Sequence, residues 1–313
     1  MKKLVFFILL VSVAGGELTS QDPGRAPTSN NPQPPGDQSR IQVRVELVNV
    51  LTTVTDKKNR LVTDLTKDDF RIFEDGKPQE IRFFSRETDL PLRIGLLMDT
   101  SNSIRDRLHF EQEAAINFLS EVLRPGKDLA FVVAFDAQHQ VVQDYTDDIE
   151  KLSNVINALK AGGATSLFDV VFFASKEKLY VFPPREPYLR RVMIVVSDGQ
   201  DNQSVHTQDE ALSMAQAAEV TIFTISTNRS GVRGKGDKVL GSLADVTGGH
   251  AFFQAEDLAA NFQEIVHELR SQYSLAYVST NTAHDGTFRK ITIRAVRKNL
   301  HVRARPGYFA LSQ

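Results

Sequence analysis

The feature that most constrains the fold is a series of near-continuous apolar segments in the middle of the chain. Residues 92–99 read LRIGLLMD, residues 129–136 read LAFVVAFD and residues 190–198 read RRVMIVVSD. Strands that are apolar at successive positions are typical of a sheet covered on both faces. Amphipathic helices are predicted between them, the first over residues 107–123. The pattern therefore predicts a doubly wound, mostly parallel α/β sheet over residues 91–271.

Two other segments of this region give more local predictions. Residues 139–146, HQVVQDYT, predict a strand that pairs antiparallel with the strand at 129–136. Residues 231–238, GVRGKGDK, are glycine-rich and basic but do not match the phosphate-binding pattern G-x-x-x-x-G-K-[ST]. We therefore predict a flexible loop there.

The segments on either side have a different rhythm. Residues 41–90 and 272–313 alternate apolar and polar positions and are rich in β-branched residues, which predicts short half-buried strands. EDGKP at 74–78 and NTAHDG at 281–286 are predicted to be hairpin turns. Each segment is small for a core of its own, so we expect the two to pack together as one small β-sandwich.

The first residues predict export. Residues 1–16, MKKLVFFILLVSVAGG, combine two lysines, a short apolar stretch and small residues, the pattern of a secretory signal peptide. An apolar strand or an uncleaved anchor is the alternative. Residues 17–40 are rich in Pro, Asn, Gln, Ser and Gly, which predicts a disordered linker. We expect a periplasmic or extracellular protein with no membrane span after signal cleavage.

Composition excludes several classes of protein. Lys plus Arg number 37 and Asp plus Glu number 39, for a net charge of -2, which does not favour a nucleic-acid partner. The chain has no cysteine, so disulfides, thiolate metal sites and cysteine nucleophiles are excluded.

Oxygen-bearing side chains gather where the apolar strands end. Asp99 ends one strand, Ser101 and Ser103 follow it, and Asp198 ends another strand. Ligands bind beyond the carboxyl ends of the strands in open α/β sheets, so both carboxylates should reach one edge. Thr165, in AGGATSLFD, begins a predicted helix. Oxygen ligands without sulfur or imidazole favour a hard cation such as Mg²⁺, with Mn²⁺ or Ca²⁺ as alternatives.

The sequence DTSNS at residues 99–103 resembles the DxSxS motif of the von Willebrand factor type A domain, which carries a metal-ion-dependent adhesion site. GGATSLFD and SDGQDN are similar to the family's second and third motifs. The resemblance covers about residues 91–271, and the flanks are similar to those of a bacterial exported subgroup. It implies a doubly wound fold and metal binding by Asp99, Ser101, Ser103, Thr165 and Asp198. It also implies cation-dependent binding of a protein that presents an Asp or Glu carboxylate.

Simpler interpretations exist for several of these residues. Asp99, Ser101 and Ser103 can instead cap the following helix. Asp169 either orients a ligand or metal-bound water or is a solvated helix residue. Asp136 favours a turn. Asp201 and Asn202 are predicted to lie in a loop at the rim of the site.

We therefore predict an exported, non-enzymatic module for metal-dependent protein binding. One rival is a metal-dependent hydrolase with Asp99 or Ser101 as nucleophile, which would require a nearby general base. No motif places a His or Lys there. The other rival is a structural envelope protein in which the metal only steadies the loops.

Overall fold

Apolar strands form a six-stranded central sheet. The computed structural model describes residues 47–86, 90–180, 189–228, 230, 232–253 and 257–310. The strand order is β10-β9-β8-β5-β6-β7, with β7 antiparallel to β6 and the other pairs parallel, as predicted. The strands are β5 (Leu92–Asp99), β6 (Leu129–Phe135), β7 (His139–Thr146), β8 (Arg190–Ser197), β9 (Val220–Ser226) and β10 (Ala251–Phe252).

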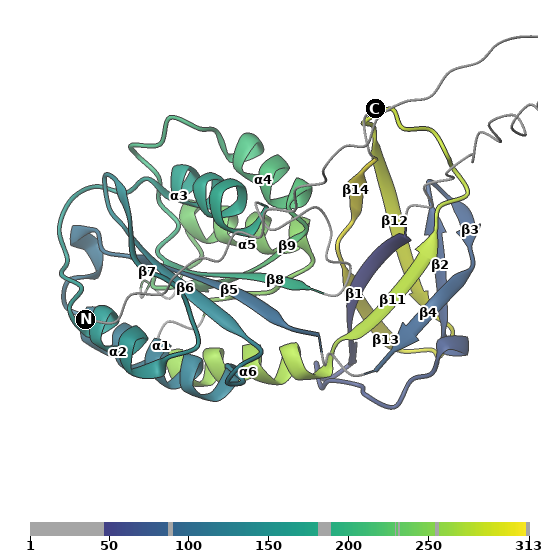
Figure 1. Ribbon diagram of the computed structural model, residues 1–313, viewed down its shortest axis with the longest axis horizontal. Coiled ribbons are helices and arrows are strands. Elements are labelled where there is room, and N and C mark those ends of the chain that lie inside the picture. Colours follow the sequence, from purple (N-terminus) through teal and green to yellow (C-terminus); the bar gives the residue numbers. More distant parts are fainter. Residues whose placement is uncertain are drawn as a thin grey trace, which may run out of the picture. The chain divides into compact units, whose positions relative to one another are not determined.

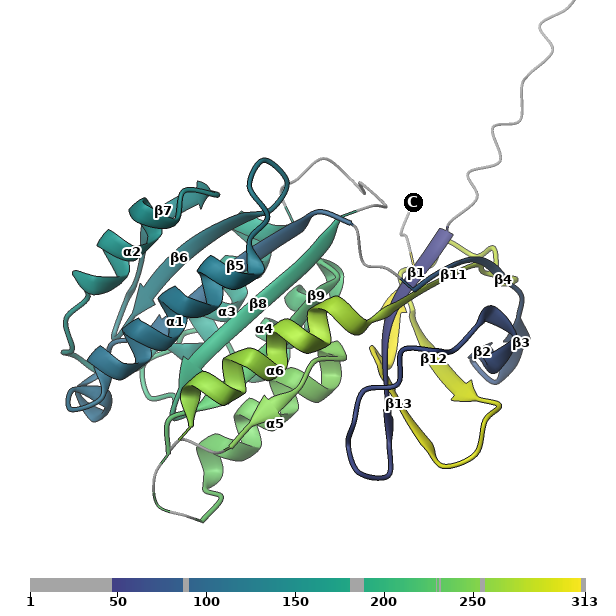
Figure 2. The same cartoon turned by 90° about the horizontal axis from the view of Figure 1, so that it is seen from below.

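Helices cover both faces of this sheet, as Figures 1 and 2 show. One face packs against α1 (Leu108–Val122), α2 (Ile149–Asn157) and α6 (Leu258–Ser271). The other packs against α3 (Leu167–Phe173), which continues as a π-helix over Ala174–Leu179, and against α4 (Gln208–Ala217) and α5 (Lys235–Thr247). Two separate hydrophobic cores result, which explains why β5 and β8 are apolar on both faces. The predicted α/β fold is confirmed.

The register of the parallel strands determines how far each candidate residue lies along the strand direction, relative to the carboxyl edge of the sheet. Met98 of β5 pairs with Val196 of β8, so Asp99 stands beside Ser197 at the carboxyl edge. Ser197 in turn pairs with Ser226 of β9. Asp198 therefore leaves the sheet one residue beyond Asp99, with Thr227 on its other side.

The flanking segments form two four-stranded antiparallel sheets, in the orders β13-β1-β11-β4 and β14-β12-β2-β3. The strands are β1 (Leu47–Asp56), β2 (Phe70–Glu74), β3 (Lys77–Gln79), β4 (Ile81–Ser85), β11 (Tyr273–Val278), β12 (Phe288–Ala295), β13 (Leu300–Ala304) and β14 (Gly307–Phe309). A single-turn 3₁₀ helix, η1 (Lys67–Asp69), precedes β2. Residues from both sheets share one hydrophobic core, so the expected β-sandwich, with strands from both ends of the chain, is confirmed.

Two local predictions about turns have opposite outcomes. Asp75 and Gly76 take positive φ angles of 47° and 80° and join the antiparallel strands β2 and β3, so the EDGKP hairpin is confirmed. The hairpin at 281–286 is wrong, because β11 pairs with β1 and β4 while β12 pairs with β2 and β14. Residues 281–286 therefore connect the two sheets of the sandwich.

The loop predicted at residues 231–238 is also wrong in its second half, because α5 begins at Lys235. The N-cap is Gly234, whose backbone N–H donates to Asp237 Oδ2 at 2.7 Å. Asp237 accordingly stabilises the first turn of α5.

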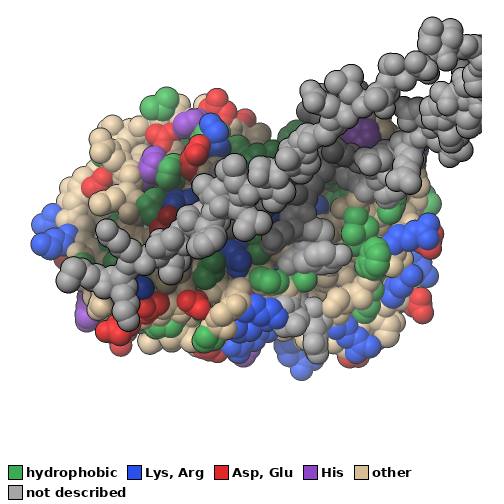
Figure 3. Space-filling model, viewed as in Figure 1, with side chains coloured by type: hydrophobic (Ala, Val, Ile, Leu, Met, Phe, Trp, Pro, Cys, Tyr) green, Lys and Arg blue, Asp and Glu red, His purple; other side chains and the backbone are tan. Residues whose placement is uncertain are grey.

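The predicted signal peptide at 1–16, the linker at 17–40 and the start of the first β segment at 41–46 lie outside the described residues. The division of the chain at residues 90 and 271 stays a prediction. In the described part, no helix is both long and apolar enough to cross a membrane. Basic and acidic side chains are mixed on the face shown in Figure 3, which gives no support to a nucleic-acid surface there.

Candidate metal centre

Asp99 is the buried anchor of the candidate site. It ends β5 and is fully buried. Its Oδ1 accepts from the backbone N–H of Ser101 at 2.8 Å, and its Oδ2 accepts from the Ser197 hydroxyl at 2.6 Å. These two hydrogen bonds fix the carboxylate at the strand end. Both donors are neutral, so neither bond pairs the carboxylate with a cation.

The loop after Asp99 turns through a short 3₁₀ helix, η2 (Asn102–Ile104). Ser101 is its N-cap by position, yet its side chain makes no capping hydrogen bond. Its hydroxyl lies 3.0 Å from the hydroxyl of Ser103 instead. The capping interpretation is therefore not what the structure shows for Ser101. Two of the three hydroxyls of the predicted ligand set therefore lie within hydrogen-bonding distance of each other.

The loop that carries Thr165 lies against both of the other loops. Gly162 N–H donates to Thr100 O at 2.6 Å, and Asn102 N–H donates to Gly163 O at 3.3 Å. Thr165 N–H donates to the side chain of Asn202 at 3.1 Å, and Thr165 O accepts from Asn202 N–H at 3.0 Å. Thr165 is 5% exposed. Its backbone is thus held in place by the loop that follows Asp198.

Asp198 begins the third loop and is only partly buried. Its Oδ1 accepts from Gln200 N–H at 2.9 Å, which tightens the turn, and Gly199 takes a φ of 75° there. A Cβ on Gly199 would come within 2.3 Å of the Gly236 carbonyl oxygen. Glycine at 199 is therefore required both by the backbone angle and by the close approach of α5.

Electrostatics at this edge favour a cation. Burial raises the pKa of Asp99, and hydrogen bonds from Ser197 and Ser101 oppose this only in part. The negative charge of Asp198 raises the pKa of Asp99 further, because like charges repel. A divalent ion would relieve this repulsion, and hydroxyl and carboxylate oxygens are ligands that Mg²⁺ and Ca²⁺ accept. The donor set therefore fits such an ion.

The described residues contain no group of three or more His, Asp or Glu side chains that could hold a metal by themselves. Any ion at this edge would therefore depend on the hydroxyls of Ser101, Ser103 and Thr165. The ligand set predicted from the sequence likewise combines two carboxylates with three hydroxyls. The structure brings the loops of all five residues to one edge.

Asp169 and Asp136 turn out to organise loops. Asp169 accepts from the backbone N–H groups of Val205 and His206 and from His206 Nδ1, the last at 2.7 Å. It thus holds the far end of the Asp198 loop against α3, a role that neither interpretation of Asp169 included.

Asp136 accepts from Gln138 N–H at 3.0 Å, which confirms the turn. Its carbonyl also accepts from both Ser166 N–H and Ser166 Oγ, beside Thr165.

Three residues that bear on the site were missed or undervalued. Ser197 bonds to Asp99, and its importance follows from strand register, which one sequence does not reveal. Asn202 was assigned only to the rim, yet it holds Thr165.

The third missed residue is Glu111 of α1. It is fully buried, and neither of its carboxyl oxygens has a hydrogen-bond partner within the described residues. Burial raises its pKa to about 8; Arg107 lowers it, and Asp99 and Asp198 raise it. A signal was present, because Leu108, Glu111 and Ala115 lie three and four residues apart on the apolar stripe.

The model of the von Willebrand factor type A domain matches residues 94–268, more than half of the chain. The chain belongs to this family.

Individual relatives are distant. The human von Willebrand factor A domain-containing protein 3B is 26% identical over 167 residues, which are 51% of this chain and 12% of the human protein. The chain thus spans only a small part of that relative. The type A domain of the type V pili tip protein Mfa5 from Porphyromonas gingivalis is 14% identical, with a TM-score of 0.48 and coverage of 57% of this chain and 94% of that one. Proximal thread matrix protein 1 from the mussel byssus, with a zinc-occupied metal-ion-dependent adhesion site, is 16% identical, with a TM-score of 0.47 and coverage of 63% and 49%.

Proposed function

We propose that the protein binds a divalent cation, Mg²⁺ in the first place, and through it a carboxylate of a partner protein. Asp99, Ser101, Ser103, Thr165 and Asp198 would hold the ion. The observation that carries the proposal is the buried Asp99 carboxylate, which is held by Ser101 N–H and the Ser197 hydroxyl and has no cation among these partners.

The chemistry of this ligand set favours docking of an anion. Two carboxylates neutralise a divalent ion only formally, and neutral hydroxyls leave it electrophilic. An Asp or Glu side chain from another protein would therefore be a favourable additional ligand. Membership of a family whose domains mediate protein–protein contacts supports this proposal.

Partner binding is favoured over hydrolysis by the contacts at the two candidate nucleophiles. Asp99 bonds to Ser197 and Ser101, and the Ser101 hydroxyl meets Ser103. Neither side chain makes a hydrogen bond or an ion pair with a His or Lys in the described part of the chain. A hydrolase would need such a base beside its nucleophile, so we propose binding without turnover.

The first experiment is thermal unfolding of the purified protein in chelator and then in millimolar Mg²⁺, Mn²⁺ or Ca²⁺. An ion present at 100 times its Kd should stabilise the fold by about 2.7 kcal/mol, a shift of a few degrees in Tm. The shift should vanish in Asp99→Ala and persist in Asp209→Ala, an exposed acidic position on α4. Equal shifts in all three proteins would refute the assignment of the site.

Two further measurements separate the rival functions. Turnover of phosphate or ester substrates in the presence of metal would establish the hydrolase. Retention of partner binding by Asp99→Ala would establish that the metal only steadies the loops.

Export is part of the proposal and has its own test. We propose that residues 1–16 are removed and that the mature protein resides in the periplasm or outside the cell. Mass spectrometry of the protein from cell fractions should find an N-terminus after residue 16 and no full-length chain. Full-length protein in the cytoplasm would contradict it.

A further inference from the structure

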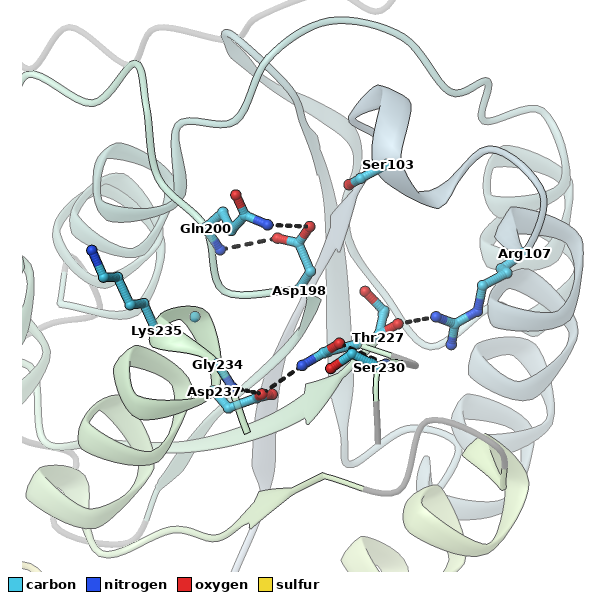
Figure 4. Close-up of a pocket in the computed structure, with 11 residues that line it drawn as sticks. Ser103, Arg107, Asp198, Gln200, Thr227, Ser230, Gly234, Lys235 and Asp237 are labelled. Atoms are coloured by element: carbon cyan, nitrogen blue, oxygen red, sulfur yellow. Dashed lines mark hydrogen bonds between the residues drawn. The ribbon is translucent and has the colours of Figure 1, made fainter. Parts of the chain in front are cut away.

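A recess lies directly beside the candidate metal ligands and has no role in the function proposed so far. Its volume is about 560 Å³, and Ser103 and Asp198 form one side of it. Arg107, Gln200, Thr227, Asn228, Ser230 and the first residues of α5 also line it, as Figure 4 shows. A recess of this size has room for a whole side chain next to the site.

The recess owes its position to the strand register and to one close backbone contact. Thr227 N–H donates to Ser197 O at 3.0 Å, which continues the pairing of β8 with β9 beyond the sheet edge. A Cβ on Gly236 would come within 2.1 Å of Asp198 O. The end of β9 and the start of α5 are therefore pressed against the loop that carries Asp198. Whatever occupies the recess also borders the metal ligands.

One buried hydroxyl in the recess lacks a partner. Thr227 is 4% exposed, and its Oγ1 makes no hydrogen bond within the described residues. In Figure 4 the Thr227 side chain lies between Asp198 and Arg107, at the wall of the recess. A buried hydroxyl without a hydrogen bond is costly, so a ligand that accepts from Thr227 would be favoured.

The charges of the recess favour an anion once Asp198 serves as a metal ligand. The Arg107 guanidinium is held at the rim by its bond to the Thr227 carbonyl. Lys235 is exposed on the first turn of α5 and has no ion pair with the described residues.

Asp237 is the second acidic residue that lines the recess. It already accepts from Ser226 Oγ at 2.5 Å, Asn228 Nδ2 at 2.7 Å and Gly234 N–H at 2.7 Å.

We infer that this recess binds a second carboxylate of the same partner protein, so that the site recognises a pair of acidic residues. This inference rests on the proposed function, because the first carboxylate is the one that docks on the metal. Thr227 Oγ1 donates a hydrogen bond to the second carboxylate, and Lys235 and Arg107 supply the opposite charge. The partner is thus an acidic peptide segment rather than a single exposed Asp or Glu.

The test uses synthetic peptides with blocked termini as probes. One peptide carries a single Asp among alanines, and the others carry a second Asp one, two or three residues further on. Binding to the full protein is measured by calorimetry or NMR in millimolar Mg²⁺ at fixed ionic strength. We expect at least one diacidic peptide to bind about tenfold tighter than the single-Asp peptide, as one charge-assisted hydrogen bond would give.

Variants assign that advantage to the recess. Thr227→Val and Lys235→Gln should each reduce it several-fold while leaving the Mg²⁺ affinity unchanged, and Thr227→Ser should restore it. Lys238→Gln is the matched control, because Lys238 is an exposed lysine of the same helix that does not line the recess. An equal loss in Lys238→Gln would show a general charge effect and would overturn the inference.

The outcomes separate the two proposals. If the protein binds Mg²⁺ and the single-Asp peptide but prefers no diacidic peptide, the recess inference is wrong and the proposed function stands. If the protein binds neither Mg²⁺ nor the single-Asp peptide, the proposed function fails and the inference fails with it.

Discussion

Two buried carboxylates, Glu74 in the β-sandwich and Asp99 in the α/β region, have opposite surroundings. Glu74 is 2% exposed and accepts from the hydroxyls of Tyr277 at 2.7 Å, Tyr308 at 3.0 Å and Ser279 at 2.5 Å. The Arg289 guanidinium lies 3.7 Å from it. Asp99 has two hydrogen bonds, a neighbouring acid and no cation among its bonded partners.

The difference supports the proposal that Glu74 stabilises the fold and that Asp99 binds a cation. A buried carboxylate that is already ion-paired and hydrogen-bonded within the fold has no remaining capacity to bind an external ligand. A buried charge that is held in place but not neutralised is suited to an external cation. The contrast can be tested by substituting each of the two carboxylates. The largest effect on the free energy of unfolding is expected at Glu74.

Glu74→Ala should destabilise the protein strongly and leave metal binding intact. Its removal takes away one of the two acids that lie near the fully buried Arg289 and leaves the phenols of Tyr277 and Tyr308 without this acceptor. We expect a loss of about 3–5 kcal/mol in the free energy of unfolding. Urea unfolding in chelator would measure it.

Asp99→Ala is the matched comparison under the same conditions. It removes two hydrogen bonds but also a poorly compensated buried charge, so the stability in chelator should change by about 1 kcal/mol or less. The two variants should then differ by several kcal/mol without metal. Similar losses in both would mean that Asp99 is as structural as Glu74.

Glu111 gives the next largest effect, through pH. Its pKa is about 8 in the folded protein because burial disfavours its charge, against an ordinary value of 4.5. Between these values the folded protein keeps a proton that the unfolded chain has lost, so stability falls as pH rises. The fall is about 1.4 kcal/mol per pH unit, or about 3 kcal/mol between pH 5 and pH 7.

Glu111→Gln removes this titrating group, so its stability should fall less steeply over the same range. Denaturant unfolding at several pH values in chelator would give both slopes. Glu113→Gln, an exposed acid on the same helix, should keep the slope of the wild type. Parallel curves for the wild type and Glu111→Gln would contradict the buried, protonated carboxyl.

The sequence was sufficient for the main fold because its signals are local and repeated. Continuous apolar strands, amphipathic helices and the positive φ of Asp75-Gly76 each follow from neighbouring residues. It was insufficient where the outcome depends on distant pairing. β11 and β12 are close in sequence but belong to different sheets, and their turn-like connection gave no sign of this.

The same division applies to the site. Asp99, Ser101 and Ser103 stand out because they follow a strand directly, and Asp198 ends another. Ser197, Asn202 and Thr227 gain their roles only from the register of β5, β8 and β9 and from the packing of loops. The glycine-rich start of α5 was assigned to a loop because the contact of Gly236 with Asp198 is not visible in the sequence.

That contact leads to a smaller effect, at Gly236. Gly236→Ala should lower both stability and metal affinity, because its Cβ would lie 2.1 Å from the Asp198 carbonyl oxygen, a backbone atom. Forcing the two segments apart should cost about 1–3 kcal/mol in the free energy of unfolding. Gly241→Ala is the matched control in the same helix, where the nearest atom would be Phe253 Cζ at 3.6 Å.

We expect Gly241→Ala to be neutral or stabilising by up to about 1 kcal/mol, since alanine is the better helix former. Thermal unfolding with and without Mg²⁺ would compare the two variants. Equal stability of Gly236→Ala and Gly241→Ala would mean that α5 does not press on the Asp198 loop.

The last effect is expected at Asn202, on metal affinity rather than on folding, and it decides whether the loops around Asp99 are prepared for an ion. The Asn202 side chain accepts from Thr165 N–H, while the backbone N–H groups of Asn202 and Gln203 both donate to Thr165 O. Asn202→Ala would remove only the first of these bonds. Loss of such a support around a metal site lowers metal affinity about tenfold, which corresponds to about 1.4 kcal/mol.

Gln203→Ala separates the side chain from the backbone. It keeps the bond from residue 203 N–H to Thr165 O, and the Gln203 side chain makes no hydrogen bond within the described residues. Calorimetric titration with Mg²⁺ should therefore give weaker binding for Asn202→Ala and an unchanged Kd for Gln203→Ala. An unchanged Kd in both would show that Thr165 does not need to be held in place to serve the ion. In that case Asp99 would be the only candidate ligand that differs from Glu74 in this way. The loop that carries Thr165 would not be organised in advance for an ion.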